Sequence, residues 1–174
     1  YVNSLRRLHA LWTLEGLNAL DWHTAFGAMT DTDPYVRAAS IRLCERLLTP
    51  GTASAFTDRL IELGDDTHEL VRLQTLLSLG SIKSEAAESV MIHLAARNPS
   101  ALFRTALLTG VKNRELEFLS RLLTQPSFEV ETPHHQELLD SLAQIVIDQA
   151  ETDRIDKLLG LTEDRVDQLP WQGY

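Results

Sequence analysis

The residues with the greatest potential for metal chemistry are two adjacent histidines, His134 and His135, flanked by Glu131 and Glu137. Neighbouring residues on a helix point about 100° apart, so such a pair seldom shares one ion. Pro133 also places a helix start between Glu131 and His135. We therefore interpret the pair as exposed polar residues and predict no metal site and no cofactor. The acidic run from Asp65 to Glu69 lacks the spacing of a calcium loop and is interpreted as a turn.

Nucleophilic catalysis finds no support in the sequence. The chain contains no Gly-x-Ser-x-Gly motif and no glycine-rich phosphate loop. Cys44 is the single cysteine, so neither an intrachain disulfide nor a Cys-x-x-Cys site can form, and its apolar neighbours indicate a small core residue. We predict no catalytic residues in this chain.

The charge balance excludes further classes of partner. The 174 residues include 16 Lys and Arg against 25 Asp and Glu, a net charge of −9. Phosphate backbones and anionic membrane surfaces both require clustered basic residues, so we predict no nucleic-acid partner. No apolar run approaches the roughly 20 residues of a membrane span, so we predict no direct membrane insertion.

An internal repeat supplies the elements that would position any site. Four similar segments begin at Arg7, Arg37, Arg72 and Arg104, with spacings of 30, 35 and 32 residues. The residues four and seven positions after each arginine are apolar, which is one face of a helix. Leucine outnumbers valine plus isoleucine by 31 to 15, which favours helices over strands.

The segments between the arginine-led helices carry a single apolar stripe each, as expected of helices that pack on one side only. Short polar residues before proline predict helix starts at Asp33-Pro34, Asn98-Pro99 and Thr132-Pro133. We predict an all-α fold, a right-handed α-solenoid of about four to five helical hairpins in one domain, 1–174. Its repeats would be roughly 1–30, 31–64, 65–97 and 98–132, with a terminal cap over 133–174.

Residues Asp31 to Ala39 read Asp-Thr-Asp-Pro-Tyr-Val-Arg-Ala-Ala, which resembles the turn and second helix of a HEAT repeat of the type found in bilin lyases. The resemblance covers residues 5 to about 125. It implies a protein-binding scaffold, whereas a bilin lyase activity would rest on analogy of fold alone.

A narrower resemblance concerns His9 to Leu17, which is similar to a segment of large secreted bacterial proteins of the membrane-bound dehydrogenase and cytochrome c type. It implies a spacer between a β-propeller and a haem domain that lie outside this chain. The chain begins at Tyr1, and we interpret it as part of a longer protein. The compartment would be periplasmic or extracellular if this resemblance holds and cytoplasmic otherwise.

The repeat arginines invite a structural interpretation. A guanidinium can form a bidentate pair with a turn carboxylate and so fix the register of adjacent turns. We predict a structural ladder of Arg37, Arg72 and Arg104 with the turn carboxylates Asp31, Asp33, Asp65 and Asp66.

A second face of the arginine-led helices varies between repeats while the apolar face stays apolar. We predict that it lines a concave binding surface, with Trp12 as an aromatic anchor. A solvated face without a ligand is the alternative. The residues of this stripe are His9, Trp12, Arg42, Arg46, Gln74, Ser78, Thr109 and Asn113.

The function predicted from these patterns is a non-catalytic interaction or scaffold module that binds a partner protein or neighbouring domains of its own chain. A spacer within a secreted dehydrogenase is one alternative. A HEAT-like DNA glycosylase is another, although Arg42, Arg46 and Trp12 provide only a thin basic and aromatic surface for it.

Overall fold

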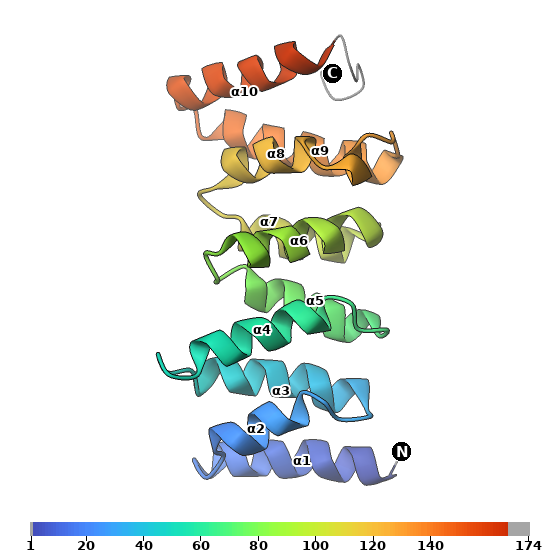
Figure 1. Ribbon diagram of the computed structural model, residues 1–174, viewed down its shortest axis with the longest axis vertical. Coiled ribbons are helices and arrows are strands. Elements are labelled where there is room, and N and C mark those ends of the chain that lie inside the picture. Colours follow the sequence, from blue (N-terminus) through green and yellow to red (C-terminus); the bar gives the residue numbers. More distant parts are fainter. Residues whose placement is uncertain (1, 167–174) are drawn as a thin grey trace. The chain divides into compact units, whose positions relative to one another are not determined.

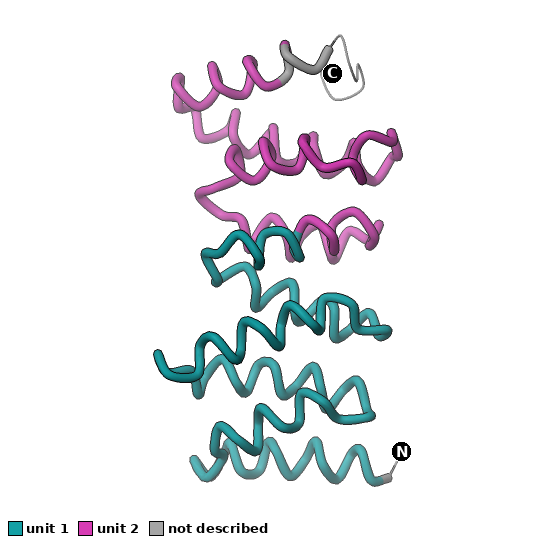
Figure 2. Tube along the Cα trace, viewed as in Figure 1, with its two compact units in different colours: residues 1–91 teal, residues 92–174 magenta. Residues whose placement is uncertain are grey.

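The computed structural model describes residues 2–166, which form ten α-helices and one short 3-10 helix and contain no strand. The predicted all-α fold of helical hairpins is therefore confirmed for this part of the chain. The chain divides into two compact units, Tyr1–Met91 and Ile92–Tyr174, and the division falls inside helix α6 (Figure 2). Within residues 2–166, none of the helices combines the length and apolar composition that crossing a bilayer requires.

The first unit is built from helices that alternate between two layers. The arginine-led helices α1, α3 and α5 pack side by side, while α2 contacts α3 and α4 contacts α5 (Figure 1). This is the pairing expected if each hairpin completes the burial of its neighbour. The elements are α1 (Val2–Gly16), α2 (Trp22–Ala28), α3 (Pro34–Arg46), α4 (Ala53–Leu63), α5 (Glu69–Leu79) and the beginning of α6 (Glu85–Arg97).

The second unit centres on α9, which contacts α7, α8 and α10. Helices α9 and α10 occupy the part of the chain predicted to form the terminal cap, and residues 167–174 of that cap lie outside the described residues. The elements are α7 (Ala101–Gly110), α8 (Glu115–Leu123), the 3-10 helix η1 (Pro126–Phe128), α9 (Pro133–Asp148) and α10 (Thr152–Val166).

Two of the three predicted helix starts are confirmed. The Asp33 carboxylate accepts the Tyr35 N–H at 2.9 Å, and the Thr132 hydroxyl accepts the His135 N–H at 3.1 Å, each with proline as the first helical residue. The start predicted at Asn98-Pro99 is wrong. Ser100 caps α7, while the Asn98 amide donates to the Leu94 carbonyl at 2.7 Å and so satisfies a carbonyl of the last turn of α6.

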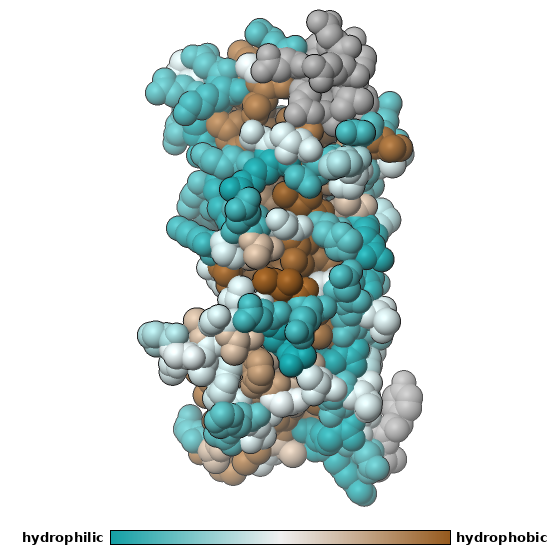
Figure 3. Space-filling view, in the orientation of Figure 1, coloured by the Kyte–Doolittle hydropathy of each residue, from teal (hydrophilic) through white to brown (hydrophobic). Residues whose placement is uncertain are grey.

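Leucine and phenylalanine side chains fill the core of each unit, as the apolar spacing predicts. Polar side chains (teal) cover much of the face seen in Figure 3, and apolar side chains (brown) are visible between them. The largest fully buried side chains are Met29, Ile41, Phe56, Leu60, Leu76, Leu79 and Met91 in the first unit and Leu94, Phe103, Leu107, Phe118 and Phe128 in the second.

Close packing is most demanding where α4 ends against α6. A Cβ atom placed on Gly64 would lie 2.5 Å from the Val90 Cγ1 atom and 3.2 Å from the Ile61 carbonyl oxygen. Valine is branched at Cβ and its χ1 angle is stiff, so the Val90 methyl group cannot swing aside freely. Glycine therefore permits the close approach of α4 to α6.

We predict that Gly64→Ala lowers the free energy of unfolding by about 1–3 kcal/mol, because the added methyl group overpacks this contact. Urea unfolding of the purified chain measures the loss. The Gly64→Ala/Val90→Ala variant lacks the obstructing methyl groups of valine. Its loss of unfolding free energy should therefore be smaller than the sum of the losses of the two single variants.

The matched control is Gly27→Ala in α2, where a Cβ atom would meet no heavy atom within 4 Å. This substitution should stabilise the chain by about 0.5–1 kcal/mol through helix propensity. Equal stability of Gly64→Ala and wild type would contradict the packing argument.

Candidate functional site

The repeat arginines of the first unit connect successive turns through carboxylates. Arg37 donates from Nε and Nη2 to the two oxygens of Asp66, both at 2.8 Å, and Arg7 binds Asp31 in the same way at 2.6 and 2.7 Å. Side chains in the first turn of a helix lean back toward its N-terminus, which brings Arg37 to the turns. In the second unit, Arg104 forms an ion pair with Glu137, which lies within helix α9, so the predicted turn carboxylate for Arg104 is corrected. We call these three pairs the arginine ladder.

A second set of contacts fixes each arginine to its own turn. Arg37 Nη1 donates to the carbonyl oxygens of Asp31 and Thr32, at 2.7 and 3.2 Å. Arg72 Nη1 donates to those of Asp66 and Thr67, at 2.9 and 3.1 Å. The offset between arginine and carbonyl is the same in both repeats, so the same local structure recurs.

The turn carboxylates divide between two roles. Asp31 and Asp66 each lie six residues before a repeat arginine, and each also accepts the backbone N–H two residues later at 2.8 Å. Asp33 instead caps α3, so its predicted place in the ladder is corrected. The carboxylate that Arg37 binds belongs to Asp66 and not to Asp65.

The ladder carboxylates are held in their charged form. The Arg7 guanidinium lowers the pKa of Asp31. Partial burial alone would raise the pKa of Asp66, but hydrogen bonds from Arg37 and from the His68 N–H outweigh it and the pKa is lowered. These pKa shifts mean that the pairs stabilise the fold at neutral pH.

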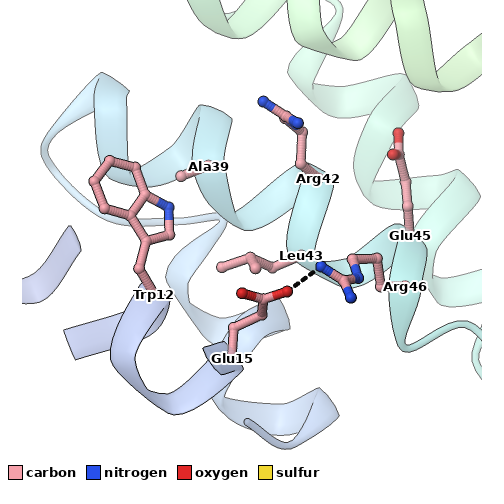
Figure 4. Close-up of a pocket in the computed structure, with 7 residues that line it drawn as sticks. All are labelled: Trp12, Glu15, Ala39, Arg42, Leu43, Glu45 and Arg46. Carbon is pink, nitrogen blue, oxygen red and sulfur yellow. Dashed lines mark hydrogen bonds and ion pairs between the residues drawn. The ribbon is translucent and has the colours of Figure 1, made fainter. Parts of the chain in front are cut away.

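A groove between α1 and α3 collects three of the predicted binding residues in the first unit. We call it the α1–α3 groove, and it has a volume of about 490 Å³. Figure 4 shows Trp12 on one side, Leu43 between the two helices, and the ion pair of Arg46 with Glu15. The lining residues are Trp12, Glu15, Ala39, Arg42, Leu43, Glu45 and Arg46.

The other members of the predicted stripe have different environments. His9 is exposed on α1 and packs edge-on against Trp12, with ring centroids 5.6 Å apart, whereas Gln74 is half-buried on α5. Ser78 is buried, which corrects its predicted exposure, and it contacts the Glu45 carboxylate of α3 because α3 packs against this side of α5.

Thr109 and Asn113 belong to the second unit. Thr109 is exposed on α7 and donates its hydroxyl to the Thr105 carbonyl at 2.8 Å. Asn113 lies in the turn after α7 with φ of 67°, a conformation that asparagine tolerates, so its predicted place on the helix face is wrong. Helix α7 ends at Gly110, three residues earlier.

The prediction that His134 and His135 are exposed polar residues is also corrected. His135 is buried against Phe128, with ring centroids 4.3 Å apart, and its Nδ1 lies 2.9 Å from the Val130 carbonyl oxygen. His134 Nε2 lies 2.6 Å from the Ala95 carbonyl oxygen. Among the described residues, no group of three or more His, Cys, Asp or Glu side chains could hold a metal ion.

Glu115 is a polar core residue that sequence reasoning missed. Its carboxylate is buried and accepts the Asn113 N–H at 2.9 Å and the side chains of Gln149 and Arg154 at 3.3 Å. Burial acts to raise its pKa, but these hydrogen bonds and the Arg154 charge lower it overall. The only sequence signal is its place at the start of a helix.

Cys44 is fully buried in α3, as its apolar neighbours predict. Burial raises the pKa of its thiol to about 12, and the nearby Glu45 carboxylate adds to this effect. The thiolate form is therefore scarce at neutral pH, and the side chain serves as a small apolar filler.

Helical hairpins that repeat every 30 to 35 residues and share an arginine–turn contact define a helical-repeat protein. Residues 25–112, just over half of the chain, match the family of HEAT repeats, and the chain therefore belongs to that family. Neither a curated protein nor a solved structure matches the chain. The family match does not include His9–Leu17 and gives no support to the dehydrogenase resemblance.

We predict that the arginines of the ladder differ in their contribution to stability according to burial. The Arg37 and Asp66 side chains are 14% and 7% exposed, so Arg37→Gln should cost about 3 kcal/mol by leaving a desolvated carboxylate unpaired. Arg7 is 43% exposed, so solvent screens its pair with Asp31 and Arg7→Gln should cost clearly less than Arg37→Gln. Urea unfolding measures both, with the exposed Arg6→Gln as control. Equal losses for Arg7 and Arg37 would refute this ranking.

A pH dependence follows from the lowered pKa of Asp66. The unfolded chain takes up a proton near the ordinary value of 3.8 before the folded chain does, so the stabilisation is complete at pH 7 and falls below about pH 5. The difference in unfolding free energy between wild type and Asp66→Asn should therefore shrink as the pH falls from 7 to 3. The Arg37→Gln/Asp66→Asn variant is the control, because neither partner remains. A difference that stays constant over this range would contradict the prediction.

Proposed function

We propose that this chain is a non-catalytic interaction module that binds another polypeptide through the exposed side of α1 and α3. The other polypeptide is a partner protein or a neighbouring domain of its own chain. HEAT repeats commonly act as protein-interaction scaffolds, and the chain belongs to that family. In this role the segment itself catalyses no reaction.

The observation that carries the proposal is the exposure of Trp12. Its side chain is 49% exposed although it lines the α1–α3 groove and lies beside the apolar Leu43. Tryptophan gives a large gain when it is covered by a partner, and it is enriched among the residues that dominate binding energy. Leaving it uncovered therefore favours a surface that another protein completes.

A spacer role within a secreted dehydrogenase is the second hypothesis, and it rests on the residues from His9 to Leu17 alone. It requires that the complete gene encode a signal peptide upstream and a Cys-x-x-Cys-His haem motif downstream. Reading the flanking gene sequence decides it, since absence of both features removes this hypothesis.

The interaction role is tested with immobilised wild-type chain, Trp12→Ala and Tyr35→Ala in a lysate of the source organism, followed by quantitative mass spectrometry. Tyr35 is the matched control because it is an equally exposed aromatic residue, 55%, that does not line the groove. A second arm uses the purified polypeptide that the flanking gene sequence encodes.

We expect at least one protein to be retained by wild type and Tyr35→Ala and to fall about tenfold or more with Trp12→Ala, the loss typical of an aromatic anchor. Calorimetric titration with that purified protein must show the same order of affinity, with wild type and Tyr35→Ala binding more tightly than Trp12→Ala. Equal retention by all three, or no retention in either arm, would overturn the proposal.

A further inference from the structure

The α1–α3 groove joins an apolar surface to a charged one. The exposed indole of Trp12 provides the apolar part, the largely buried side chain of Leu43 lies beneath it, and Arg42 extends from the same helix as Leu43 (Figure 4). The His9 ring packs edge-on against the Trp12 ring at an interplanar angle of 89°. Tryptophan has only two side-chain torsions to fix, so it loses little conformational entropy on binding.

The other charged side chains of the groove already have partners within the first unit. Arg46 forms an ion pair with Glu15, and the Glu45 carboxylate contacts the Ser78 hydroxyl. Arg42 is exposed, and it makes no hydrogen bond or ion pair with any residue that the structure describes. One guanidinium beside an apolar surface is therefore left to bind a ligand.

We propose that this groove binds a peptide segment in which a carboxylate lies next to an apolar or aromatic side chain. The carboxylate pairs with Arg42, whose planar guanidinium can donate two parallel hydrogen bonds, and the apolar side chain covers the exposed indole of Trp12. The carboxylate can come from an Asp or Glu side chain or from a chain terminus. This inference rests on the proposed interaction function and specifies the ligand.

The charges of the groove disfavour nucleic acid as the ligand. A phosphate backbone is bound by several cations acting together, whereas Glu15 neutralises Arg46 and Glu45 adds a negative charge. The net charge of the chain is −9, which further opposes a polyanion. A single carboxylate requires only one cation, and Arg42 supplies it.

The test is selection from a random heptapeptide library displayed on phage, using the purified chain as bait. We expect the selected peptides to be enriched in Asp or Glu within two positions of an aromatic residue or leucine. The best peptide is then synthesised in amidated form, with a free C-terminus, and with each acidic residue replaced by its amide. Binding of these versions, measured by fluorescence anisotropy, shows which carboxylate is used.

Arg42→Gln should weaken binding of the best peptide about tenfold or more, whereas Arg6→Gln, which changes an exposed arginine outside the groove, should not. Trp12→Ala should weaken binding to a similar degree. Thermal unfolding of each variant checks that the fold is retained.

Selected peptides without acidic enrichment, or binding that Arg42→Gln leaves unchanged, would overturn the ligand assignment. So would salt-sensitive binding of a labelled duplex or single-stranded DNA that Arg42→Gln abolishes. Retention of a partner that depends on Trp12, together with peptides that lack acidic residues, would remove this assignment and leave the interaction function standing.

Discussion

A single helical hairpin of this chain cannot bury its own apolar surface, and the rest of the structure follows from that constraint. The arginine-led helices carry apolar residues on more than one side, so α3 buries Ile41 and Leu43 only with α1, α2 and α5 packed around it. Apolar burial is not directional, however, and would tolerate slippage between neighbouring helices. The bidentate pair of Arg37 with Asp66 has a fixed geometry, which specifies one register.

The α1–α3 groove follows from the same constraint on packing. Faces that hold the hairpins together are committed to leucine, phenylalanine and the ladder arginines, so the remaining face is free to vary in sequence. In the first unit this face carries the exposed side chains of Trp12 and Arg42, both of which line the groove.

The repeat, the all-α fold and the arginine–turn contacts could be predicted from the sequence, because each depends on local spacing. The failures at Ser78 and His135 have a common physical origin. Ser78 and His135 are polar residues whose burial depends on a partner from another element, the Glu45 carboxylate and the Val130 carbonyl respectively. Spacing along one helix carries no information about such partners. Asp66 could have been preferred over Asp65, since it lies six residues before Arg72, as Asp31 lies six residues before Arg37.

The recurrence of one contact geometry makes the block of residues 31–65 self-compatible. Asp31 accepts hydrogen bonds from Arg7 in the preceding repeat, and Arg37 donates to Asp66 in the turn of the following repeat. A tandem copy of this block would thus present each neighbour with the complementary half of the pair. Adding whole hairpins by tandem duplication would thus preserve the arginine–carboxylate pair at each new junction.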